Sequence, residues 1–210
     1  MSNDGLLYDV GKFFSDKVNR LGPNPQGADY NSPESQFVRF DQLMKLLPPV
    51  EHSFSLIDYG CGYGALAHYM RQKGYQFDYQ GFDISEAMIQ HALQQKPAGV
   101  NWKFFAQESD LTPADYTIAC GVFNVKLAAD SKAWQSLILE TFGKIAKLSK
   151  KGFSFNMLTN YSDADRMAQR PDLYYGDALF FFDYCKRNFS RNLALLHDYN
   201  LYDWTILVRM

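Results

Sequence analysis

The chain has 210 residues, of which 47% are apolar, enough for one hydrophobic core but short for two. Its 21 basic and 23 acidic residues give a formal net charge of -2, which disfavours nucleic acid or an anionic membrane as a partner. With neither a secretory signal nor an apolar run long enough to span a bilayer, we expect a cytoplasmic protein with no membrane partner. Cys61, Cys120 and Cys185 fit neither a disulfide framework nor a zinc site, so we expect thiols and no metal.

Two helices are expected before the first strand. Apolar residues recur with helical spacing from Leu7 to Val18 and again from Phe37 to Leu47, and a polar loop over residues 22–27 separates the two patterns. Ser32 followed by proline predicts the start of the second helix. We therefore expect residues 1–50 to form a helical appendage or lid on a main domain of residues 51–210.

From about residue 54 apolar runs alternate with amphipathic patterns, which is typical of a parallel sheet covered by helices on both faces. The two last runs are too close in sequence for a crossover helix and must pair antiparallel. The sequence thus predicts a doubly wound, seven-stranded, mostly parallel α/β sheet with an antiparallel C-terminal hairpin. The expected strands lie at about 54–59, 77–82, 100–105, 115–120, 152–157, 193–198 and 202–208, and the clearest helices at about 131–149 and 177–189.

A glycine-rich turn follows the first strand in the segment Asp58-Tyr-Gly60-Cys-Gly62-Tyr-Gly64. Glycine lets the backbone turn sharply and approach a ligand closely. The glycines also satisfy a dinucleotide-binding pattern, with Asp83 placed where a ribose-binding acid belongs. However, Asp58 would repel a pyrophosphate at the mouth of the turn, whereas it suits a ligand with an amine and a positive sulfonium, as in S-adenosylmethionine.

This turn resembles the D/E-x-G-x-G-x-G motif of class I S-adenosylmethionine-dependent methyltransferases, and the resemblance extends over about residues 54–209. It implies a small stand-alone enzyme for a small-molecule substrate, in which Asp83 holds the ribose hydroxyls and Ile84 packs on adenine. The third strand departs from the family's Gly-Asp ending, which leaves the adenine contact open between Gln107 and Glu108. The cofactor residues that the resemblance implies are Asp58, Gly60, Cys61, Gly62, Gly64, Asp83, Ile84, Gln107, Glu108 and Cys120.

The acceptor side has weaker signals. Arg39 flanks the buried stripe of the second helix and could pair with the methionine carboxylate of the cofactor, or could be a solvated helix arginine. The segment 159–176 follows the fifth strand at the carboxyl edge of the sheet, where acceptor pockets form, and with the N-terminal helices it would roof the site. Substrate-pocket candidates are Tyr30, Phe123, Asn124, Tyr174 and Tyr175, and candidate catalytic residues are His197, Asn124 and Tyr161.

We therefore expect in-line methyl transfer from S-adenosylmethionine to oxygen or nitrogen of a small molecule. Gly121-Val-Phe-Asn124 stands where many amino-group methyltransferases carry Asn-Pro-Pro-Tyr, which weakens DNA-base and glutamine-type substrates. A non-catalytic S-adenosylmethionine-binding regulatory or assembly module and a protein methyltransferase stay open as alternatives. A nicotinamide-dependent oxidoreductase survives only if Asp58 points away from the turn.

Overall fold

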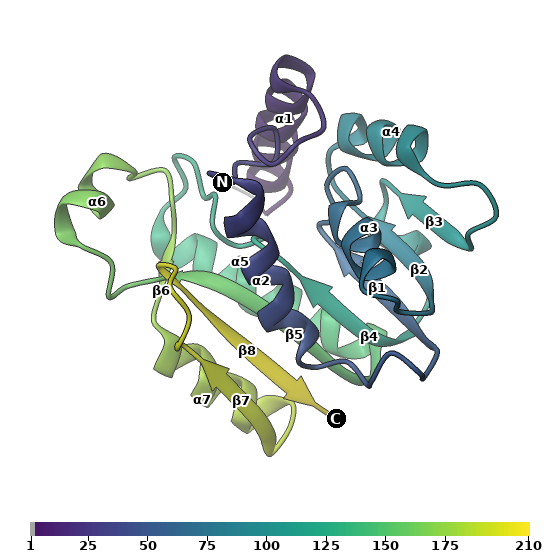
Figure 1. Ribbon diagram of the computed structural model, residues 1–210. Helices are drawn as coiled ribbons and strands as arrows, with labels where there is room; N and C mark the ends of the chain where they lie inside the picture. Colours follow the sequence, from purple (N-terminus) through teal and green to yellow (C-terminus); the bar gives the residue numbers. More distant parts are fainter. Residues whose placement is uncertain (1–2) are drawn as a thin grey trace.

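Eight strands form one mixed sheet in the computed structural model, which describes residues 3–210 (Figure 1). The strand order is β3-β2-β1-β4-β5-β8-β7, and β6 pairs with β5 beside this path. Strands β1 to β5 run parallel, whereas β8 is antiparallel to both β5 and β7. The strands are β1 (Phe54–Tyr59), β2 (Phe77–Phe82), β3 (Trp102–Phe105), β4 (Ala114–Ala119), β5 (Ser149–Thr159), β6 (Tyr175–Gly176), β7 (Asn192–Leu196) and β8 (Asp203–Arg209).

The predicted fold class is confirmed, but the strand number of seven was one too low. The additional strand, β6, has two residues, which pair with Leu158 and Thr159 at the end of β5. Two residues show no alternation of apolar and polar side chains, so the sequence pattern could not reveal this strand. The sheet's antiparallel end is the expected hairpin of β7 and β8.

Within residues 3–210, seven α-helices connect or flank these strands. The second begins as expected, because Ser32 caps it reciprocally with Ser35 and Pro33 is its first residue. None of the helices within residues 3–210 is long and apolar enough to cross a membrane. The helices are α1 (Asn3–Leu21), α2 (Pro33–Met44), α3 (Ala65–Gln72), α4 (Glu86–Gln95), α5 (Ser131–Leu148), α6 (Ala164–Gln169) and α7 (Ala178–Asn188), with a short 3-10 helix at Glu108–Asp110.

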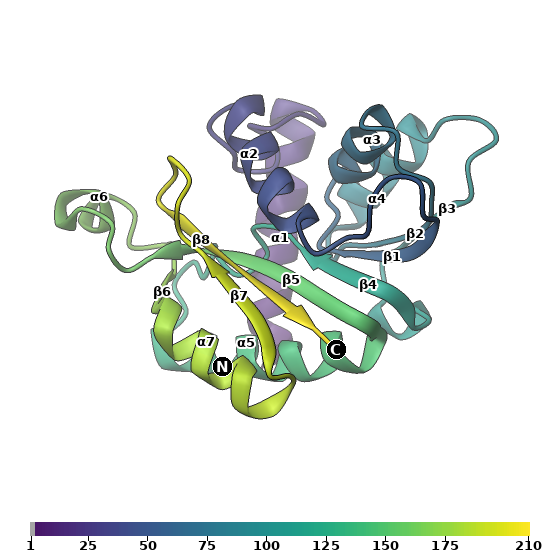
Figure 2. The same cartoon turned by 60° about the horizontal axis from the view of Figure 1, so that its bottom comes forward.

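The sheet is buried on both faces. Adjacent residues of β1 point to opposite faces of the sheet. Leu56 packs in the cluster built from α2 and α3, whereas Ile57 packs in the cluster built from α5 and α7. Figure 2 shows α5 and α7 on one side of the strands and α2 and α3 on the other. This continuous burial accounts for the apolar runs of the parallel strands.

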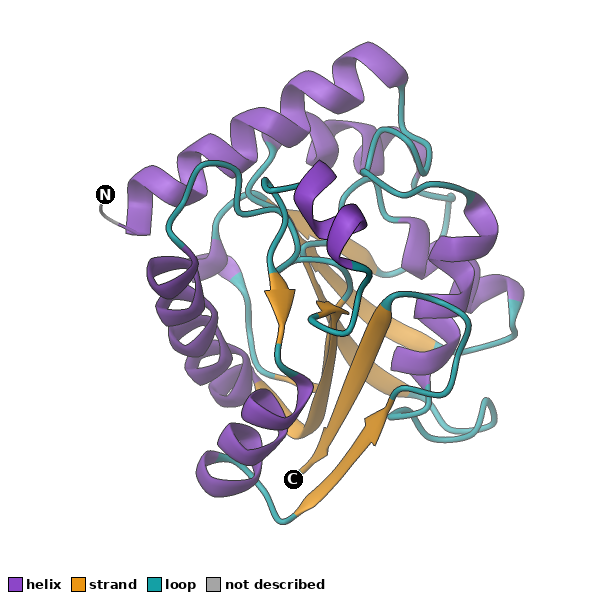
Figure 3. Ribbon diagram, turned by 90° about the vertical axis from the view of Figure 1, so that its left-hand side faces the viewer, coloured by secondary structure: helices purple, strands orange, loops and turns teal. Residues whose placement is uncertain are grey.

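The two N-terminal helices pack against the rest of the chain. Helix α1 lies along α4, where Val18 is buried beside Met88, and its Leu6 and Val10 join the cluster beneath α5. Figure 3 shows α1 running across the top of the molecule, above the ends of the strands. The interpretation of residues 1–50 as a lid stays a prediction.

Candidate cofactor and acceptor cavity

A cavity of about 580 Å³ lies at the carboxyl edge of the parallel strands. Its walls come from the turn after β1, the loop after β4, both N-terminal helices and the segment from Leu158 to Tyr175. Fourteen of the residues singled out in the sequence line it. They are Tyr30, Arg39, Asp58, Gly60, Cys61, Gly62, Asp83, Ile84, Gln107, Glu108, Cys120, Phe123, Asn124 and Tyr175.

The glycine turn is held across the end of β2. The backbone N–H groups of Gly60 and Cys61 both donate to the carbonyl oxygen of Phe82, at 2.7 and 2.8 Å. Gly60 has φ +80°, and a Cβ there would lie 2.5 Å from Cγ2 of Val122. Gly62 has φ +54° but would meet only the sulfur of Met88, at 3.8 Å. Gly60 is therefore required by packing and conformation, and Gly62 by conformation alone.

Asp58 is buried at the base of the cavity, where its Oδ2 accepts a hydrogen bond from the Tyr79 hydroxyl at 2.7 Å. Burial raises the pKa of the Asp58 carboxyl to about 7, the Tyr79 hydrogen bond opposes the rise, and the nearby charge of Asp83 adds to it. The carboxyl lies near the turn, since the charge of Asp58 contributes to the raised pKa of the Cys61 thiol within it. An organic cation bound here would restore its charged form.

Asp83 ties the turn to the end of β2. Its Oδ2 accepts from the backbone N–H of Gly62 and its Oδ1 from that of Ser85, both at 2.8 Å. Burial raises the pKa of the Asp83 carboxyl to about 6, against the effect of these two bonds. The cap of α4 is Ser85, whose hydroxyl accepts from the N–H of Met88. Because each carboxylate oxygen has a second lone pair, Asp83 can still accept two hydroxyl groups from the cavity.

Gln107 and Glu108 differ in what they already bind. Glu108 accepts from the Tyr59 hydroxyl at 2.6 Å and pairs with the Lys144 ammonium at 3.1 Å. Among residues 3–210, no group bonds to the side-chain amide of Gln107, which also lines the cavity. The amide can both donate and accept, as the edge of an adenine requires.

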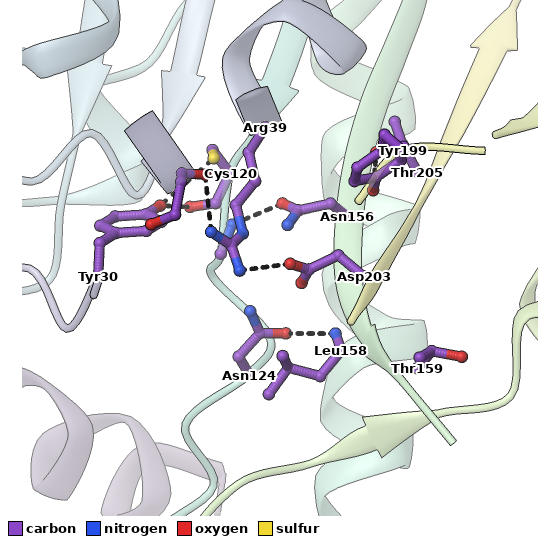
Figure 4. Close-up of polar contacts among 12 residues, drawn as sticks. Tyr30, Arg39, Cys120, Asn124, Asn156, Leu158, Thr159, Tyr199, Asp203 and Thr205 are labelled. Atoms are coloured by element: carbon purple, nitrogen blue, oxygen red, sulfur yellow. Dashed lines mark hydrogen bonds and ion pairs between the residues drawn. The ribbon is translucent and has the colours of Figure 1, made fainter. Parts of the chain in front are cut away.

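Arg39 is a buried ion-pair partner, not a solvated helix arginine. Figure 4 shows its guanidinium against the carboxylate of Asp203, at the start of β8. The Tyr30 ring lies 5.5 Å from the guanidinium carbon, and its hydroxyl is 3.3 Å from both the carbonyl oxygen and the sulfur of Cys120. Asp203 was not predicted from the sequence, because a single acid at the start of a strand has no distinguishing pattern.

All three cysteines are buried free thiols, as expected. Burial raises the pKa of the Cys120 thiol to about 12, and burial likewise raises the pKa of Cys61 well above its usual range. Neither is therefore a nucleophile at neutral pH. Among the described residues, no group of three or more His, Cys, Asp or Glu side chains is arranged to hold a metal ion.

Four candidate residues lie outside the cavity lining. His197 is exposed just after β7 and faces Tyr161, itself 69% exposed, with 6.1 Å between ring centroids. Tyr174 is buried against Phe181 in the core. Gly64 caps α3 with φ +84°. The structure therefore does not bring His197, Tyr161 or Tyr174 to the reacting centre, and no histidine within residues 3–210 lines the cavity.

Other lining residues were missed because the sequence pattern assigned them to the core or to connections. Trp134, for example, lies on the apolar stripe of α5, lines the cavity, and donates its Nε1–H to the carbonyl of Phe123 at 2.8 Å. A helical stripe cannot tell a core side chain from one that borders a cavity. The missed residues include Leu7, Val10, Phe14, Asp29, Trp134, Leu137, Ile138, Lys144, Arg166, Gln169 and Arg170.

Comparison with known proteins identifies the family. Residues 7–174 match the family described as a methyltransferase domain. The chain is 46% identical over 156 residues to Rv1506c of Mycobacterium tuberculosis, whose name describes it provisionally as a methyltransferase, and the match covers 74% of this chain and 93% of that protein. The chain therefore belongs to the methyltransferase family, and it is a class I, S-adenosylmethionine-dependent enzyme.

Solved structures share the fold. Magnesium protoporphyrin IX methyltransferase (ChlM) of Synechocystis PCC 6803, with bound S-adenosylhomocysteine, has a TM-score of 0.65 at 18% identity, covering 97% of this chain and 99% of that one. The N-methyltransferase NodS of Bradyrhizobium japonicum WM9, with the same ligand, has a TM-score of 0.60 at 14% identity and 97% coverage of both chains. Membership of the methyltransferase family, which rests on the family match and on the relative Rv1506c, argues against the alternatives of an oxidoreductase and a non-catalytic module.

Proposed function

We propose that this enzyme transfers the methyl group of S-adenosylmethionine to an oxygen or nitrogen of a small-molecule acceptor, by in-line displacement. One observation carries the proposal. A single cavity joins the glycine turn and its two carboxyls, Asp58 and Asp83, to a second region walled by the N-terminal helices and the segment from Leu158 to Tyr175. A donor and an acceptor can therefore share one cavity.

The cavity residues suit the cofactor at both of its ends. S-adenosylmethionine, when bound, supplies a methyl group already activated on a sulfonium. Asp83 would accept the two ribose hydroxyls, Ile84 would pack on the adenine, and the free amide of Gln107 would read the adenine edge. Glu108 is less suited to that contact, because its carboxylate is already bonded to Tyr59 and Lys144 and, when ionised, cannot donate to a ring nitrogen of the adenine edge.

At the methionyl end, the cavity offers a side chain of opposite charge to each charged group of the cofactor. Asp58 would gain from a nearby ammonium group, which offsets the burial that raises its pKa. Arg39 would bind the carboxylate with guanidinium N–H groups that are engaged neither by Asp203 nor by the carbonyl oxygen of Ser35, to which Nη1 donates at 2.8 Å. Gly60, Gly62, Cys61 and Cys120 would then supply backbone and small side chains where the ligand approaches closely.

On the acceptor side the chain would mainly align groups and exclude water. Tyr30, Phe123, Asn124 and Tyr175 line this region and are the proposed pocket residues. Asn124 is well placed to fix its shape, because its carbonyl accepts from Tyr174 N–H at 2.8 Å and its side chain from Leu158 N–H at 3.0 Å. ChlM, a structural neighbour, acts on a small molecule named in its description, magnesium protoporphyrin IX.

The test combines binding with transfer. Calorimetric titration of the full chain should give micromolar or tighter binding of S-adenosylmethionine and S-adenosylhomocysteine and none of NAD. Incubation with methyl-labelled S-adenosylmethionine and a small-molecule extract should then give labelled products below about 1 kDa. Label found only in protein after adding the macromolecular fraction would refute the small-molecule acceptor and leave a protein methyltransferase.

A further inference from the structure

The amide of Asn124 has a fixed orientation in the acceptor region. Its Oδ1 accepts from the backbone N–H of Leu158 at 3.0 Å. Because that N–H can only donate, the oxygen must face it, and the amide NH2 must face the other way. Figure 4 shows this nitrogen on the side of Arg39, away from Leu158. Asn124 therefore turns its NH2 donors, rather than its carbonyl oxygen, toward the side away from Leu158.

The neighbouring wall is also rich in donors. Arg166, Gln169 and Arg170 line the cavity from α6 and the residue after it. The Arg166 guanidinium lies 4.4 Å from the centroid of the Tyr202 ring, and no carboxylate within residues 3–210 forms an ion pair with it. Arg166 lines the cavity and is exposed to solvent. Its positive charge is therefore available to a ligand.

Carboxylates in the cavity are either neutralised or placed elsewhere. Asp29 pairs with Arg170, the residue after α6, and also with Lys17. Asp58, Asp83 and Glu108 belong to the turn after β1 and to the ends of β1, β2 and β3, on the cofactor side. The acceptor side thus offers N–H groups and positive charge, which favour an anion over an amine.

No histidine within residues 3–210 lines the cavity, and Asp29 on this side is ion-paired with Lys17 and Arg170, so this side offers neither an imidazole nor an unpaired carboxylate as general base. An alcohol or an ammonium acceptor must lose a proton when it is methylated. A carboxylate has already lost its proton at neutral pH, since its usual pKa is about 4. A donor bound to one carboxylate oxygen also leaves the lone pairs of the other oxygen free to attack.

From these observations we infer that the acceptor is a small carboxylic acid, methylated on its carboxylate, and that Asn124 and Arg166 bind that carboxylate. The inference rests on the proposed small-molecule methyl transfer and specifies its substrate class. In the step, an oxygen lone pair forms the new O–CH3 bond while the S–CH3 bond breaks and its electron pair stays on sulfur. No proton moves, and the products are a methyl ester and S-adenosylhomocysteine.

The chemical lability of the product provides the first test. The full chain is incubated with methyl-labelled S-adenosylmethionine and a small-molecule extract of the organism that encodes it, and the product is then treated with mild alkali. Methyl esters release labelled methanol, whereas N-methyl and ether products keep their label. We expect most of the label to be released. Stable label would overturn this inference but keep the proposed function, and absence of label would overturn both.

Two variants test the assigned residues with the same extract. Asn124→Asp keeps the oxygen that accepts from Leu158 but replaces the NH2 donor by a second oxygen. We expect it to lower the rate of ester formation at least tenfold while S-adenosylhomocysteine binding stays within about twofold. An amine acceptor would instead tolerate or prefer the new carboxylate, so an unchanged or higher rate would overturn the inference.

Arg166→Gln is a second variant. Because Arg166 is exposed, this substitution should not disturb the packing of the core. We expect it to raise the KM for the acid severalfold with little change in kcat, and Arg166→Lys to restore most of the loss. If Arg166 had only a structural role, restoring the positive charge with lysine would not restore the KM. Ester formation that is unchanged by both Asn124→Asp and Arg166→Gln would refute their assignment as carboxylate ligands.

Discussion

Arg170 and Asp29 form an ion pair across 141 residues of sequence, with one guanidinium nitrogen 3.4 Å from a carboxylate oxygen. The pair joins the end of α6 to the loop before α2, the two segments expected to roof the cavity. Arg170 also donates hydrogen bonds to Asp172 through Nε and Nη2, and Asp29 pairs with Lys17 of α1. Because Arg170 is half exposed, the pair contributes on the order of 0.2 to 1 kcal/mol, which suits a contact that opens and closes.

We expect the roof to respond as one unit. Binding of S-adenosylhomocysteine should slow amide exchange in residues 22–31 and 162–172 together, and Arg170→Gln should reduce the protection of both segments by about 1.5- to 5-fold, as the loss of such an ion pair implies. Hydrogen exchange with mass spectrometry measures both. Point substitution is preferable to removing α1, because Leu6, Val10 and Val18 are buried in the core.

Arg187→Gln is the matched control, since Arg187 forms an exposed ion pair with Asp183 on α7 and does not line the cavity. It should leave the exchange of both segments unchanged. Equal mobility of the two segments with and without ligand would mean that the site is an open cleft. A protein acceptor would then become the better hypothesis.

The turn itself is tested at Gly62. Gly62→Val should abolish measurable cofactor binding, because it adds a branched side chain where the ligand approaches and forces φ +54° on a β-branched residue. The strain alone costs about 1 to 2 kcal/mol of folding stability. Calorimetry and thermal unfolding separate the two effects.

Gly74 supplies a control for the strain, since it has φ +89° and a Cβ at this position would meet no atom within 4 Å. Gly74→Val should lower the melting temperature about as much as Gly62→Val and keep full cofactor affinity. Micromolar binding by Gly62→Val would remove the turn from the proposed cofactor site.

Asp83 should hold the ribose through two charge-assisted hydrogen bonds. Each is worth roughly 1.5 to 3 kcal/mol, so Asp83→Ala should weaken cofactor binding by at least one order of magnitude. It should also destabilise the empty protein, because the N–H groups of Gly62 and Ser85 lose their acceptor. Ser85→Ala is the control, since it removes the cap of α4, costs about 1 kcal/mol of stability and should leave affinity unchanged. An unchanged dissociation constant for Asp83→Ala would limit Asp83 to a structural role.

Most of the fold could be predicted from the local spacing of apolar residues in the sequence. The strand at 54–59 and the strand at 77–82 have the bounds that their apolar runs predict, and α5 begins and ends within one residue of its predicted bounds. The two strands read as apolar runs because the sheet is covered on both faces, and α5 is 18 residues long, so its helical period is unambiguous. Helix α6 was not predicted because its six residues, Ala164–Gln169, include no buried side chain to reveal a period.

For the site, too, residues within one stretch of sequence could be predicted, whereas contacts between distant segments could not. Asp58 and Asp83 could be found because they stand at fixed distances from the glycines of one turn, within a single stretch of sequence. The pairs Arg39 with Asp203 and Asp29 with Arg170 join residues more than a hundred positions apart. Such contacts depend on how the strands are ordered in the sheet, which one sequence does not specify residue by residue. His197 was singled out as a candidate base for its chemistry alone, and the fold leaves it exposed after β7.

Cofactor affinity should depend on pH through Asp58, whose pKa burial raises to about 7, with a smaller contribution from Asp83 at about 6. A carboxyl whose pKa is higher in the folded than in the unfolded protein holds its proton more tightly when folded. The empty protein therefore loses stability from this group as pH rises from about 4 to 7. A cationic ligand needs the ionised carboxylate, so affinity has the opposite trend and should rise up to tenfold per unit between pH 5.5 and 7.

Asp58→Asn separates the two trends, because its amide oxygen can still accept from the Tyr79 hydroxyl but carries no charge. Its melting temperature at pH 7.5 should exceed that of the unchanged protein, since a buried charge has been removed. Its affinity for S-adenosylmethionine should fall at least tenfold at pH 7.5 and vary little from there down to about pH 6.5. Titrations at several pH values, with thermal unfolding of the empty protein, measure both. An affinity of the unchanged protein that stays flat from pH 5.5 to 7.5 would mean that Asp58 does not face the ligand's positive charge.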